Sequence, residues 1–161
     1  MSGISQYIAK PRSIEEISDS ANALRKALEI REGEQFPIVE FLEIILPSID
    51  EAFSLEVVES DIMPDRYGVT YPQKHTIVIR EDVYYGATEN NRNDLITLAH
   101  ELCHYLFHDE PEFSLARTIY GDDIPETYCP EWQADTFADK LLWPSKVKGL
   151  KLFSKHSKKV L

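Results

Sequence analysis

The residues with the clearest chemical potential form the segment His100 to His104, which reads HELCH and matches the pattern HExxH. On an α-helix, two histidines four residues apart lie one above the other, so both imidazoles can reach one metal ion. Zinc brings the pKa of a water ligand close to neutrality, and Glu101 is placed to take a proton from that water. The spacing therefore predicts a zinc hydrolase in which His100 and His104 are ligands and Glu101 is the general base.

The residues around this pattern divide into two helical faces. A helix predicted from about Asp94 to His108 carries the motif on a polar face and an apolar stripe, which includes Cys103, on the opposite face. A helix whose histidines only face solvent is the plain alternative. His108 shares the polar face, but it lies about 12 Å along the axis from His100, so these three histidines cannot bind one ion. We expect a structural or substrate-side role for His108.

A catalytic zinc ion needs a third protein ligand and one open position. Glu131 lies in the first turn of a helix predicted to start at Pro130 and to end before Pro144. Asp135, one turn later, could accept the free N–H of a ligating histidine and so fix its tautomer. Two alternatives stay open: Glu131 could be only a favourable acid at a helix start, and Cys129 could be the ligand instead.

The same helix predicts how it packs. Ala134 and Ala138 lie in its apolar stripe, and these small side chains would let it approach the metal-binding helix closely. Gln133 and Lys140 are expected to point away from that contact.

The elements before the motif suggest a single α+β domain. Ser13 and Glu16 read as a capping box that starts the first helix. Two helices are predicted at about 14–32 and 37–46, the second ending before Pro47, followed by strands at 54–58, 67–71 and 75–80, a turn-rich stretch at 86–93 and a long loop at 109–127.

Composition narrows the function classes. The chain has 161 residues, with 17 basic and 28 acidic side chains and a formal charge of −11, which disfavours a general nucleic-acid-binding face. We find no apolar run near the length of a membrane span and no secretion signal, and two cysteines make no disulfide framework, so we expect a cytoplasmic protein.

Residues 145–161 hold six lysines and no acid. We expect this basic tail to follow a domain at 1–144, either solvated against the acidic body or docking an acidic partner or nucleic acid.

The two motifs together are familiar. HELCHYLFH at 100–108 and EWQADTFADKLLWP at 131–144 resemble the ImmA/IrrE family of metallopeptidases, whose usual forms are HELGH and Glu-x-x-Ala-(Asn/Asp)-x-Phe-Ala-x-x-Leu-Leu-Met-Pro. Trp143 replaces the usual methionine and Cys103 the usual glycine. The resemblance extends over about residues 14–144.

The resemblance implies both a fold and a site. The fold is a gluzincin-like zincin domain, for which we expect a small, mostly antiparallel three-stranded sheet, the HExxH helix and a following helix that bears a glutamate. The site is one zinc ion held by His100, His104 and Glu131, with Glu101 as the base.

The resemblance also implies site-specific cleavage of a helix-turn-helix repressor from a prophage, mobile element or stress locus. We expect the target peptide to add a strand to residues 75–80, and the oxyanion donor to be Tyr105, His108, Tyr120 or Tyr128. Three alternatives stay open: a non-proteolytic, metal-stabilised binding module of phage or toxin–antitoxin type, a hydrolase of small amides, and a DNA-dependent protease that uses the basic tail.

Overall fold

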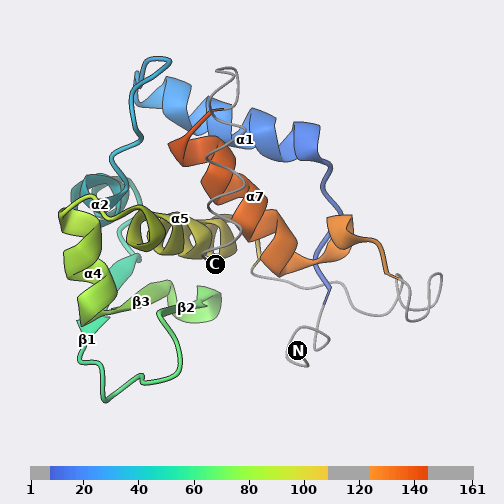
Figure 1. Ribbon diagram of the computed structural model, residues 1–161. Helices are drawn as coiled ribbons and strands as arrows, with labels where there is room; N and C mark the ends of the chain where they lie inside the picture. Colours follow the sequence, from blue (N-terminus) through green and yellow to red (C-terminus); the bar gives the residue numbers. More distant parts are fainter. Residues whose placement is uncertain (1–7, 109–123, 145–161) are drawn as a thin grey trace.

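The computed structural model of the protein describes residues 8–108 and 124–144 (Figure 1). The basic tail at 145–161 and most of the predicted loop at 109–127 lie outside the described residues. The described elements, in chain order, are the helices α1 (Ile14–Ala27), α2 (Ile38–Glu40), η2 (Phe41–Ile45) and α3 (Leu46–Ile49), the strands and turn β1 (Ser54–Val58), β2 (Gly68–Tyr71), η3 (Pro72–Lys74) and β3 (Thr76–Arg80), and the helices α4 (Glu81–Thr88), α5 (Arg92–Phe107), η4 (Glu126–Tyr128) and α7 (Pro130–Leu142).

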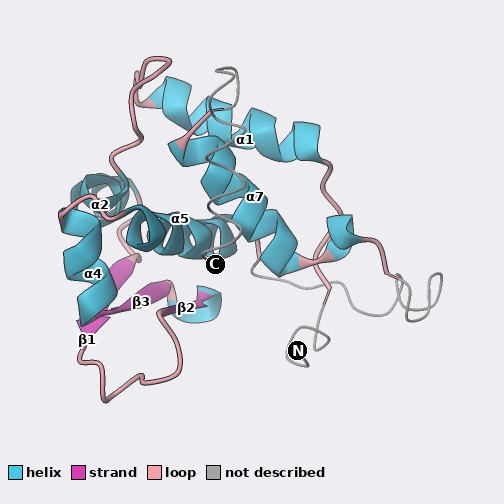
Figure 2. Cartoon of the chain, in the orientation of Figure 1, coloured by secondary structure: helices cyan, strands magenta, loops and turns pink. Residues whose placement is uncertain are grey.

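The three strands form one mixed sheet in the order β1-β3-β2 (Figure 2). β1 pairs parallel to β3, with Leu55 opposite Ile77, whereas β2 pairs antiparallel to β3, with Thr70 opposite Ile77. The expectation of a mostly antiparallel sheet was therefore wrong, because the last strand inserts between the first two. β3 takes the central position, in agreement with the burial of Ile77 and Ile79 and with its β-branched sequence.

This order also corrects the predicted peptide-binding edge. β3, which covers most of the 75–80 segment, is paired on both sides and cannot accept another strand. Within the described sheet, β1 and β2 are the edges, and β2 is the one that packs beside α5.

Three predictions about helix boundaries also needed correction. The second helix does not stop before Pro47, because the chain stays helical to Ile49 through the π-helical turn η2. In that turn the Leu46 N–H donates to the carbonyl of Phe41, five residues back, and this wider turn leads directly into the proline. The stretch predicted as turns at 86–93 begins inside α4, and the first helix ends at Ala27 rather than near residue 32. The capping box at Ser13 and Glu16 is present.

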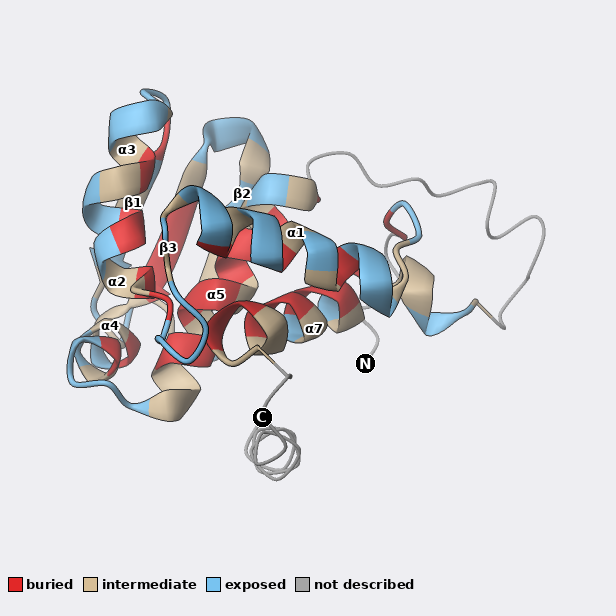
Figure 3. Ribbon diagram, turned by 90° about the horizontal axis from the view of Figure 1, so that it is seen from above, coloured by how far each residue is buried: buried red, intermediate tan, exposed pale blue. Residues whose placement is uncertain are grey.

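α5 lies at the centre of the fold, between the sheet on one side and α7 on the other, and α1 covers the far side of α7 (Figure 1). The facing sides of α5 and α7 are buried (Figure 3). Ala134 and Ala138 are completely buried there, as their size predicted, and Cys103 is buried in the core. No helix in the described part of the chain is long and apolar enough to cross a membrane.

Candidate metal centre

The two helices that carry the site start at well-defined positions. Asn91 caps α5, and its side chain accepts a hydrogen bond from the backbone N–H of Asp94. Pro130 occupies the first turn of α7, where a missing N–H costs nothing. α5 thus presents His100 and His104 on one face, and the first turn of α7 brings Glu131 to that face.

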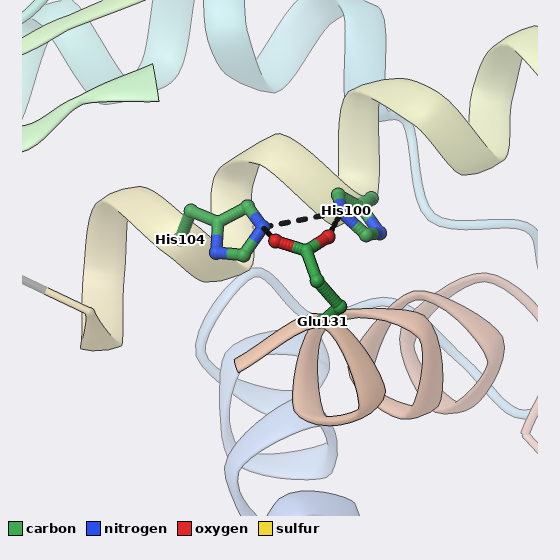
Figure 4. A group of neighbouring side chains, drawn as sticks. All are labelled: His100, His104 and Glu131. Atoms are coloured by element: carbon green, nitrogen blue, oxygen red, sulfur yellow. Dashed lines mark hydrogen bonds and ion pairs between the residues drawn. The ribbon is translucent and has the colours of Figure 1, made fainter. Parts of the chain in front are cut away.

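His100, His104 and Glu131 converge on one point (Figure 4). The two Nε2 atoms are 3.1 Å apart, and they lie 2.9 Å and 3.2 Å from the Glu131 carboxylate oxygens. Two ligands of a tetrahedral zinc ion are separated by about 3.3 Å when metal–ligand distances are near 2 Å. The spacing and the donor set of two imidazoles and a carboxylate therefore fit a zinc ion.

Asp135 contacts the other nitrogen of His100, with 2.8 Å between Oδ1 and Nδ1. This is the contact that would hold the Nδ1 proton and leave Nε2 free for a metal. Burial lowers the pKa of His100, but the hydrogen bonds from Asp135 and Glu131 outweigh it and raise that pKa to about 10. Burial raises the pKa of Glu131, yet its contacts with both histidines bring it well below its usual range. The two shifts favour a positively charged His100 and a negatively charged Glu131, which attract each other.

Glu101 is buried beside this cluster, with only 7 % of its surface exposed. The hydroxyl of Thr70, on β2, donates to its Oε1 at 2.7 Å. β2 also passes closely at Gly68, where a Cβ would lie 3.2 Å from the Glu101 Cγ. The sheet thus orients the carboxylate that the motif assigns as the base.

A family model described as Peptidase_M78, the IrrE N-terminal-like domain, matches residues 50–147, which is more than half of the chain. The chain belongs to this family. The match confirms the resemblance to the ImmA/IrrE metallopeptidases and makes the protein, at the level of its family, a metallopeptidase. Neither a curated protein nor a solved structure matches the chain.

His108 of this Peptidase_M78 domain is not one of the converging groups. Its Nδ1 lies 2.8 Å from Nδ1 of His104, and its Nε2 lies 2.7 Å from Oε1 of Gln133. Burial lowers the pKa of His108 to about 4, so the imidazole is neutral at neutral pH. The expectation that Gln133 points away was wrong, because its side chain is completely buried.

The other candidates of the Peptidase_M78 domain take different places. Among the described residues, Cys129 is not part of any metal-binding cluster. The Tyr105 hydroxyl donates to Asp50 at 2.5 Å, and burial together with this bond raises its pKa, so it is engaged away from the ligands. Tyr120 lies outside the described residues, and Tyr128 is half-buried in η4. The oxyanion donor is therefore not assigned.

Sequence reasoning missed two residues of the site, Thr70 and Gln133. Thr70 lies 31 positions before its partner Glu101, and Gln133 lies 25 positions after His108. Thr70 belongs to no motif, and Gln133 occupies an unspecified position of the Glu-x-x-Ala motif, so only the packing of the sheet and of α7 on α5 brings them to the site. The sequence offered one signal, for Gln133 only. A helical projection shows which face of the helix carries Gln133, but it does not show which segment covers that face.

Proposed function

We propose that this protein is a zinc-dependent endopeptidase that hydrolyses one peptide bond in a helix-turn-helix transcriptional repressor. The observation that carries the proposal is the oriented, buried carboxylate of Glu101 next to three converging ligand groups. A module that only binds a partner has no use for such a base. The repressor as target rests on the resemblance to the ImmA/IrrE metallopeptidases.

The chain's own residues supply the following steps. His100, His104 and Glu131 would hold the zinc ion, and Asp135 would keep the proton on Nδ1 of His100. When bound, zinc supplies polarisation of the scissile carbonyl and acidification of a water molecule. Glu101 takes one proton from that water as the water oxygen attacks the carbonyl carbon of the scissile bond. The same carboxyl then gives the proton to the leaving amine, so the base is restored when the C–N bond breaks.

The shape of the site favours a polypeptide substrate. The side chains of Glu131 and Asp135 are 52 % and 54 % exposed, so the centre lies open at the surface. β2 is an edge strand and contacts Glu101 through Thr70, so an extended peptide could pair with β2 in place of the segment 75–80 that the sequence suggested. A small amide would leave most of this surface unused.

The deciding experiment compares the wild-type chain with Glu101→Gln in cells that contain the cognate repressor. We expect new protein N-termini, mapped by mass spectrometry, to appear with the wild type and to vanish with the variant, while both proteins keep equal zinc. Glu126→Gln is the matched control, because it makes the same change at an exposed glutamate of η4 and should cleave normally. Identical new N-termini with Glu101→Gln would refute the general-base role.

A further inference from the structure

A chain of hydrogen bonds runs from the candidate metal centre to the backbone of η4 and of the segment before α1. His104 contacts His108, and His108 contacts Gln133. The Nε2 atom of Gln133 lies 2.8 Å from the carbonyl oxygen of Lys10 and 2.7 Å from that of Thr127. His104, His108 and Gln133 are all buried.

The carbonyls of Lys10 and Thr127 fix the orientation of the Gln133 amide group and therefore the direction of its hydrogen bonds. A carbonyl oxygen can only accept, so the Gln133 amide group must turn its NH₂ toward Lys10 and Thr127. Its oxygen then faces Nε2 of His108 and, at 3.3 Å, a guanidinium N–H of Arg12. Both neighbours of that oxygen must therefore be donors.

The same logic passes through His108 to the metal ligand. A neutral imidazole carries one proton, and His108 uses it on Nε2 to donate to Gln133. Its Nδ1 is then an acceptor, so the contact with His104 forms only if His104 donates from Nδ1. A histidine protonated on Nδ1 has its lone pair on Nε2, the atom that faces His100 and Glu131.

We propose that His108 and Gln133 are positioning residues that hold His104 in its metal-binding tautomer. The role resembles that of Asp135 toward His100, but it is filled by a histidine and an amide instead of a carboxylate. A neutral acceptor behind His104 adds no further negative charge to a site that already contains Glu101, Glu131 and Asp135. The inference rests on the proposed zinc site.

One of the two carbonyls that anchor these hydrogen bonds, that of Lys10, lies outside the part that the family model matches, whereas that of Thr127 lies inside it. Lys10 and Arg12 precede α1, whereas the match begins at residue 50. The backbone N–H groups of Ala9 and Arg12 donate to the carbonyls of Tyr128 and Thr127, which fastens this N-terminal segment to η4. Residues 8–12 therefore complete the support of the metal centre.

The test measures zinc affinity of the full chain by competition with a chelator. His108→Leu removes the acceptor, and we expect affinity to fall about 10–100-fold. His108→Gln can accept from His104 and donate to Gln133, so we expect affinity within about threefold of the wild type. Arg25→Met is the matched control, because Arg25 is also buried and donates to a backbone carbonyl, that of Leu141 near the other end of α7. This control should lower thermal stability and leave affinity unchanged.

A second measurement does not depend on the variants folding. In the zinc-bound wild type with ¹⁵N-labelled histidine, we expect scalar coupling across the hydrogen bond between the two Nδ1 atoms. Absence of that coupling, or wild-type zinc affinity in His108→Leu, would overturn this inference and leave the proposed function untouched. Equal losses in the Leu and Gln variants would overturn it as well. A wild-type chain that binds no zinc would remove the proposed function and this inference together.

Discussion

At the scale of single residues, the site depends on side chains that orient other side chains. Asp135 contacts His100, His108 contacts His104, and Thr70 donates to Glu101. On both histidines the contact uses Nδ1, whereas Nε2 faces the other candidate ligands, so orientation and metal binding use different atoms of the same ring. The proposed ligands and the proposed base would thus be held in place before a metal ion or substrate binds, which reduces the reorganisation needed during the reaction.

Thr70 provides a test of this arrangement. Thr70→Val keeps the shape of the side chain but removes the hydroxyl that donates to Oε1 of Glu101. We expect kcat for peptide cleavage to fall about tenfold, because one lost hydrogen bond to a charged group costs about 1.5 kcal/mol. Zinc content should not change, since Thr70 contacts no ligand of the cluster.

The control for this prediction is Thr76→Val, because the Thr76 hydroxyl donates to the carbonyl of Lys74 at an exposed position. Its kcat should equal that of the wild type. An unchanged kcat in Thr70→Val, or an equal drop in both variants, would show that the contact does not orient the base.

At the scale of elements, the corner between α4 and α5 sets the position of the active-site helix. α4 ends at Thr88, the Asn91 N–H donates to the carbonyl of Gly86, and α5 begins at Arg92. Gly86 lies against the carboxyl group of Asp94, and a Cβ added there would overlap that group and lie 2.8 Å from its Cγ. The absence of a side chain at Gly86 is what leaves room for the Asp94 carboxyl group between the two helices.

We therefore expect Gly86→Ala to lower the stability of the protein, which is the opposite of the usual effect of this substitution in a helix. Glycine to alanine inside a helix normally stabilises a protein by up to about 1 kcal/mol. Here we expect the free energy of unfolding, measured with urea, to fall by about 1–3 kcal/mol because of overpacking. In an Asp94→Ala background the nearest remaining atom is the Cβ of residue 94, at 3.4 Å, which is an ordinary contact. The same change should then be neutral or stabilising, and a loss that persists would contradict the packing argument.

At the scale of the whole molecule, the candidate metal centre joins two helices whose ligands are far apart in the sequence. Glu131 follows His104 by 27 positions (131 − 104), and the intervening chain includes residues 109–123, which are not described. An ion that binds only the folded protein increases the free energy of unfolding, and the increase grows with the ion concentration relative to Kd. A bound metal ion would therefore add to the packing of α5 on α7, which already buries Ala134, Phe137 and Ala138 in an apolar contact.

Metal removal tests this view. At a zinc concentration a hundredfold above Kd, binding adds roughly 2.7 kcal/mol to the free energy of unfolding. We therefore expect a chelator to lower the Tm of the zinc-bound wild type by about 5–10 °C. Differential scanning calorimetry provides the measurement. In Glu131→Ala, which should contain sharply less zinc, the chelator should change Tm little. A chelator effect of equal size in both proteins would mean that Glu131 is not a ligand.

Local patterns were enough to predict the helices of the site and the groups that meet there. Helical spacing alone puts His100, Glu101 and His104 on one face, and the apolar stripe of 130–143 aims Glu131 and Asp135 at it. The strand ranges were predicted closely for the same reason, since alternation and β-branching are local properties.

Contacts between distant segments could not be read in this way. The central place of β3, the contact of Thr70 with Glu101, and the burial of Gln133 all depend on which strands pair and which segment covers a helix. A periodic pattern shows that a face must be buried, but it does not say by what. The spacing of the motif residues therefore determined which groups can do chemistry here, and the tertiary structure decided how each of them is oriented, because hydrogen bonds between segments more than twenty residues apart exist only after the chain has packed.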